Sequence, residues 1–132
     1  MDQEAASKLV LDTLASQVVR TARGMGERVV QGNVPKNPLT GKPAMPELER
    51  VHEKLKAAGL LDDAEFTSDL TALLTQTGEQ CIWPALTWHD GSWGSDEGKQ
   101  LHLSIKGGVD LHDYLHELWR GSVHKMLLKP AE

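Results

Sequence analysis

The sequence has a single cysteine, Cys81, which excludes an intramolecular disulfide and a cysteine-rich zinc site. Residues 1–4 are acidic on balance, and no apolar run typical of a secretory signal peptide follows them. No stretch approaches the 18 apolar residues that a membrane-spanning helix requires. We therefore expect a soluble, cytoplasmic protein that does not enter a membrane.

Aromatic residues are scarce apart from tryptophan: there are one Phe, one Tyr and four Trp. Trp83 and Trp93 are the predicted binding anchors, because an exposed indole contributes strongly to binding. Trp88 and Trp119 are expected in the core instead. The alternative is that all four indoles are buried together.

Positive charge is limited to one part of the chain. The net charge is −5, yet residues 20–42 carry five basic residues against one acidic residue. Residues 60–120 hold eleven carboxylates, including Asp96 and Glu97. A duplex-binding protein is usually basic overall, so nucleic acid is not an expected partner. The charge distribution favours a protein partner with a basic surface, or simply a surface that keeps the domain in solution.

Apolar spacing predicts a long amphipathic helix over residues 4–30. Its apolar stripe consists of Leu11, Leu14, Val18, Ala22, Met25 and Val29. We expect this stripe to pack on the domain's own core. A homodimer through the 11–29 helix stripe is the alternative, because so narrow a stripe also suits a helix–helix seam.

Four prolines, two glycines and two asparagines predict an internal loop over residues 32–46. A second helix is predicted to begin at Pro46 and to end before Gly59. A third helix is predicted from Asp62 or Asp63 to about Gly78.

After these helices the apolar spacing changes. Leu101, Leu103 and Ile105 alternate with polar residues, which predicts a strand, and residues 82–88 alternate less regularly. Pro84 indicates that this earlier strand lies at an edge or contains a bulge. A last helix is predicted to begin at Asp110. The sequence thus predicts one α+β domain over residues 1–132, with three N-terminal helices, a β-hairpin at about 82–106 and a C-terminal helix packed on it.

His112 and His116 are spaced four residues apart in the predicted last helix. Two histidines at this spacing share a helix face and can bind one metal ion, but a third ligand would have to come from elsewhere. The simpler interpretation is that both lie at the border of the apolar face, where an imidazole keeps one edge in water. Because each imidazole would keep one edge at the surface, we predict that both are binding residues, and we expect no cofactor.

Three functions remain open. The first is a non-enzymatic macromolecule-binding protein of the inhibitor, immunity, anti-defence or adaptor type, which uses an acidic, Trp-bearing surface. Its predicted binding residues are Trp83, Trp93, Asp96, Glu97, His112 and His116. The second is a metal-dependent hydrolase with His112 and His116 as ligands. The third is a small-ligand-binding protein with an aromatic pocket beside the last helix.

Overall fold

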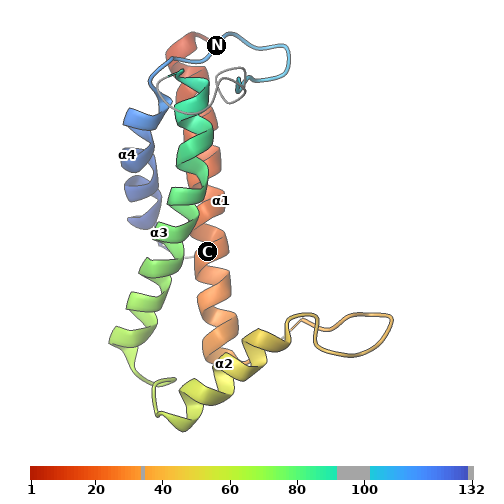
Figure 1. The fold of residues 1–132 in the computed structure, drawn as a ribbon. Helices are drawn as coiled ribbons and strands as arrows, with labels where there is room; N and C mark the ends of the chain where they lie inside the picture. The colour runs from red at the N-terminus through yellow and green to blue at the C-terminus, as the bar shows by residue number, and fades with distance from the viewer. Residues whose placement is uncertain (34, 92–101, 131–132) are drawn as a thin grey trace. The chain divides into compact units, whose positions relative to one another are not determined.

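The computed structural model describes residues 1–33, 35–91 and 102–130 of the chain. Its helices are α1 (Gln3–Gln31), α2 (Pro46–Ala57), α3 (Ala64–His89) and α4 (Leu115–Leu127), shown in Figure 1. The chain forms two compact units, one of residues 1–20 with 76–132 and the other of residues 21–75. No strand occurs among the described residues, whose only β pairing is an isolated bridge between Lys36 and Pro43. The described fold is all-helical, so the α+β prediction was wrong.

The predicted β-hairpin fails because its first half is the end of a helix. Residues 82–89 continue α3, with Pro84 inside the helix. Ile82 packs against the core and Leu86 is fully buried, four residues later, which is the spacing of a helix face. The apolar residues of segment 82–88 that suggested a strand therefore belong to a helical pattern, which is too short there to be distinguished from alternation. Residues 102–105, expected as the second strand, form no regular element.

The earlier elements agree better with prediction. The helices expected over 4–30 and from Pro46 are confirmed as α1 and α2, and Gly59 follows α2 with a φ of 73°. Asp63 caps the N-terminus of α3, as predicted, because its Oδ1 accepts the N–H of Phe66 at 3.0 Å. The helix end expected near Gly78 was wrong, because α3 continues to His89. The last helix begins at Leu115 rather than near Asp110.

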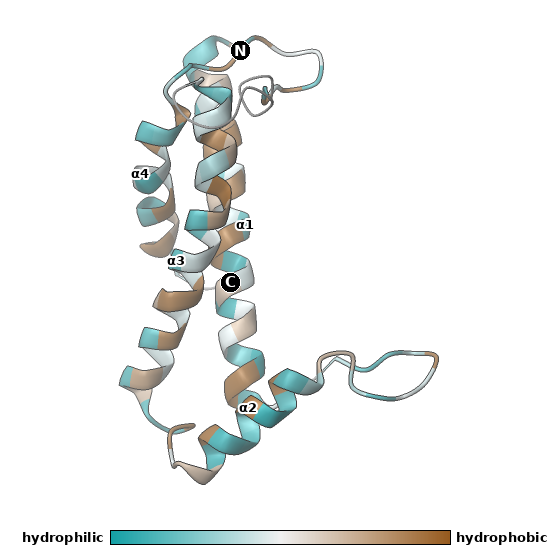
Figure 2. Cartoon of the chain, in the orientation of Figure 1, coloured by the Kyte–Doolittle hydropathy of each residue, from teal (hydrophilic) through white to brown (hydrophobic). Residues whose placement is uncertain are grey.

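The core of the first unit joins α1, α3, α4 and the segment before α4. Leu11 and Ala15 of α1 meet Leu86 of α3, and Leu115 and Trp119 of α4. Trp119 is fully buried, as predicted, and its indole N–H donates to the Glu79 carbonyl oxygen at 3.0 Å. Brown apolar residues recur along α1 and α4 in Figure 2, in keeping with this core.

The apolar stripe of α1 is used inside the chain. Leu11, Ala22 and Val29 are buried, while Leu14 and Val18 pack against the core of the first unit. A homodimer through this stripe stays an untested prediction.

The second unit holds α2 against the end of α1. Val29 and Leu48 are buried, and His52 Nδ1 donates to the Val29 carbonyl oxygen at 2.6 Å. Gly32 adopts a φ of 70° beside the His52 ring, where a Cβ would come within 2.8 Å of Nε2. The chain therefore turns out of α1 at the point where only glycine fits. Teal, hydrophilic residues dominate α2 in Figure 2.

Within the part of the chain that the structure describes, none of the helices has the length and apolar content required to cross a lipid bilayer.

Gly78 allows α3 to approach α1 closely, which gives a stability prediction. A Cβ at position 78 would lie 2.9 Å from Val18 Cγ1, so Gly78→Ala forces the Val18 side chain or one of the helices to shift. We expect this overpacking to lower the free energy of unfolding by about 1–3 kcal/mol, measured by urea denaturation.

Gly121→Ala is the matched control, because position 121 also lies in a helix of the first unit but has nothing within 4 Å of the added Cβ. This variant should raise stability by about 0.5–1 kcal/mol through helix propensity. Equal effects of the two substitutions would show that the α1–α3 approach at Gly78 is not tight.

Candidate functional site

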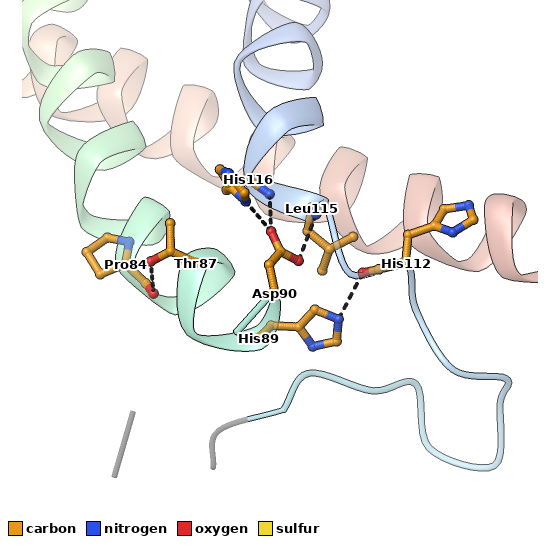
Figure 3. A network of polar contacts seen from close by, with 7 residues as sticks. All are labelled: Pro84, Thr87, His89, Asp90, His112, Leu115 and His116. Atoms are coloured by element: carbon orange, nitrogen blue, oxygen red, sulfur yellow. Dashed lines mark hydrogen bonds and ion pairs between the residues drawn. The ribbon is translucent and has the colours of Figure 1, made fainter. Parts of the chain in front are cut away.

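A buried carboxylate connects the end of α3 to the beginning of α4. Asp90 directly follows α3, and its side chain is fully buried. Its Oδ1 accepts the backbone N–H of Leu115 at 2.8 Å, and its Oδ2 accepts that of His116 at 2.8 Å (Figure 3). The Oδ2 atom also contacts Nδ1 of the His116 ring. Asp90 therefore satisfies two free N–H groups at a helix N-terminus, where the helix dipole favours negative charge.

The neighbouring His89 holds the segment that leads into α4. Its Nδ1 accepts the N–H of Leu103 at 2.9 Å, so its Nε2 carries the proton and donates to the His112 carbonyl oxygen at 3.0 Å. Figure 3 shows His89 and Asp90 reaching different parts of this segment from the same helix end. The His89 ring is buried and lies 4.4 Å, between centroids, from the His102 ring. These contacts fix the course of the chain before α4.

The beginning of α1 holds the same segment from another side. The N–H of His112 donates to Ser7 Oγ at 2.8 Å, and Gln3 Nε2 donates to the Leu111 carbonyl oxygen at 3.4 Å. Ser7 and Leu111 are buried. Residues 111–116 are thus anchored by side chains of both α1 and α3, and this gives α4 a fixed position beside α3.

A surface pocket lies where α4 runs alongside α3. It has a volume of about 390 Å³ and is lined by Glu79, Gln80, Trp83 and Arg120; we call it the Trp83 pocket. Arg120 Nε donates to Glu79 Oε1 at 3.3 Å, and the Glu79 side chain is only 18% exposed. Trp83 remains 40% exposed. The pocket therefore combines an indole face, a largely buried carboxylate and an exposed guanidinium.

Pro84 changes the backbone hydrogen bonding of α3 beside this pocket. Proline has no N–H, so residue 84 cannot donate to the carbonyl oxygen of Gln80, which is four residues earlier in α3. The Gln80 carbonyl oxygen has thus lost its usual helical donor.

The predicted site residues are only partly brought together. Trp83 lies at the pocket, and its ring contacts that of His116 edge-on, with 6.2 Å between centroids. His112 precedes α4 and stacks instead on Tyr114. The premise that His112 and His116 share one helix was therefore wrong. No group of three His, Cys, Asp or Glu residues suited to a metal ion occurs within the described ranges.

Trp93, Asp96 and Glu97 lie outside the described residues. Sequence reasoning missed the roles of Asp90, His89 and Ser7, because each acts on a segment that is distant along the chain. The only available signal was Asp90 directly before Gly91, a pair that lies within the hairpin predicted at about 82–106.

The described site is a surface pocket lined by residues of two helices, α3 and α4. Comparison of the chain with protein-family models, curated proteins and solved structures gives no match.

Asp90 gives the second stability prediction. Asp90→Ala leaves two N–H groups at the beginning of α4 without their acceptor, in a site where the carboxylate is fully buried. We expect a loss of about 3 kcal/mol in the free energy of unfolding, measured by urea denaturation.

The exposed Asp113 provides the control, since Asp113→Ala should change stability by less than about 0.5 kcal/mol. If both alanine variants unfold at the same urea concentration, Asp90 does not hold α4 in place.

Proposed function

We propose that this protein binds another protein through an acidic, Trp-bearing surface centred on the Trp83 pocket, and that binding is its activity. An inhibitor, an immunity protein, an anti-defence protein or an adaptor works in this way. We also propose a cytoplasmic location, on the basis of the single cysteine, Cys81.

The observation that carries the proposal is the exposure of Trp83 at the edge of a pocket. A tryptophan usually buries most of its large apolar surface, yet this indole is 40% exposed beside polar groups. Tryptophans that bind in a pocket between polar neighbours are frequent hot spots of protein interfaces. The anchoring of residues 111–116 supports this role, because it orders the α4 side of the pocket before a partner arrives.

Charge supports a basic partner. The first unit contains eleven acidic and seven basic residues in the sequence, a net charge of −4. Glu79 and Glu117 belong to the two helices that flank the pocket. Such a surface attracts a basic protein and raises the rate of encounter.

The proposal is tested by photo-crosslinking followed by affinity measurement. A photo-crosslinking amino acid at the exposed position Gln80 would attach the partner in native cells, and mass spectrometry would identify it. With the purified partner, Trp83→Ala should weaken the Kd at least about tenfold, because truncation of a hot-spot Trp costs about 2 kcal/mol or more and about 1.4 kcal/mol is a factor of ten.

Leu73→Ala is the matched control, because Leu73 is also a large apolar residue of α3 and is 63% exposed. It should leave the Kd unchanged. The same assay applies to Trp93→Ala and to charge reversal at Asp96 and Glu97, each of which should weaken binding. If neither the two Trp variants nor the charge reversals change the Kd, this surface is not the binding surface.

A small-ligand-binding function is the second candidate, and the pocket volume favours it. About 390 Å³ lies within the range of small-molecule sites, and the indole, amide and guanidinium of the lining residues suit a planar polar ligand. Screening of metabolites by NMR would test this function through shifts of the Trp83 indole N–H signal.

A further inference from the structure

The loop between α1 and α2 is held in one conformation by its own hydrogen bonds. The N–H of Asn37 donates to the Lys42 carbonyl oxygen at 2.8 Å, and that of Gly41 donates to the Asn37 carbonyl oxygen at 2.8 Å. Below this turn, the N–H of Ala44 donates to the Pro35 carbonyl oxygen at 2.7 Å. Pro38 and Pro43 restrict the backbone further. We call residues 35–44 the Leu39 loop; it extends beyond α2 in Figure 1.

The tip of this loop is apolar and its flanks are basic. Leu39 is 93% exposed, which is the highest exposure of any large apolar side chain among the described residues. Its N–H donates to Asn37 Oδ1 at 2.9 Å, so the backbone at the tip is fixed. Lys36 and Lys42 are exposed on either side, and residues 32–46 contain no acidic residue. An ordered loop with an exposed leucine loses little conformational entropy on binding.

The Trp83 pocket has the complementary properties. Its volume of about 390 Å³ is ample for a leucine side chain, and the Trp83 indole offers an apolar wall. Glu79 supplies a carboxylate, which in the single chain pairs with Arg120 at 3.3 Å. A lysine ammonium group of the loop is able to replace the Arg120 guanidinium as the partner of this carboxylate.

We propose that the Leu39 loop of one copy of this chain docks in the Trp83 pocket of a second copy. Leu39 packs on the Trp83 indole, and Lys36 or Lys42 pairs with Glu79. Arg120 turns outward to admit the loop; its side chain is 87% exposed and one hydrogen bond to Glu79 holds it. Because loop and pocket are different surfaces, the contact is heterologous, and it blocks the pocket until a tighter partner displaces the loop.

The first test is sedimentation equilibrium of the full chain alone, so it is independent of any partner in the proposed function. The wild-type mass should rise above 14.5 kDa between about 10 μM and 1 mM, the range of small transient contacts. Leu39→Asp and Trp83→Ala should each remain monomeric. Leu128→Asp, at a leucine that is 74% exposed, should associate like the wild type.

The second test mixes the two defective variants. Leu39→Asp keeps its pocket and Trp83→Ala keeps its loop, so an equimolar mixture should form a heterodimer of twice the chain mass. In ¹⁵N-labelled Leu39→Asp protein, the Trp83 indole N–H signal should shift when unlabelled Trp83→Ala protein is added. If Trp83→Ala does not fold, Gln80→Arg at the exposed pocket edge replaces it in both tests.

Three results would overturn the proposal. They are a wild-type chain that is monomeric at about 1 mM, undiminished association of Leu39→Asp, and a mixture of the two variants that stays monomeric. A wild-type monomer that still binds a partner through Trp83 would remove this inference and leave the proposed function standing.

Discussion

The first unit depends on one buried carboxylate. Asp90 directly follows α3, and its carboxylate accepts the first N–H groups of α4. The end of one helix therefore fixes the beginning of the other. A charge with no exposure is tolerated there because both of its oxygens are hydrogen-bonded and a helix N-terminus faces it. With α4 held in this way, Trp119 is buried against α3 and Arg120 is brought to Glu79.

The packing of α3 against the core explains why Trp83 lies at the surface. Pro84 and the packing of Ile82 and Leu86 commit the inner face of α3 to the core, which leaves position 83 on the outer face beside α4. A proline within a helix costs stability in isolation, and here the buried side chains around it offset that cost. The proposed binding surface and the proposed self-association both use this outward-facing indole. In the first the pocket holds a partner protein, and in the second it holds the Leu39 loop of another copy. Only the second therefore depends on the concentration of this chain alone.

The sequence predicted much of the helical first part of the chain. Pro46, Gly59 and Asp63 each have a local preference that marks a helix end, and the structure agrees at all three. Prediction failed over residues 82–89, where alternating apolar residues and a proline indicated an edge strand. Over so short a segment the periods of a strand and a helix are hard to distinguish, and only burial against α1 and α4 selects the helix.

The sequence by itself determined the elements with strong local preferences, the unequal charge distribution, and the candidacy of Trp83 as a binding residue. Tertiary structure alone decided that Gly78 is a helix contact, that Asp90 caps α4 from 25 residues away, and that His112 and His116 separate. The physical reason is the distance along the chain over which each interaction acts. N-cap residues, prolines and glycines act within a few residues of themselves. A buried carboxylate, or a glycine where two helices cross, acts on residues that only the folded chain brings near.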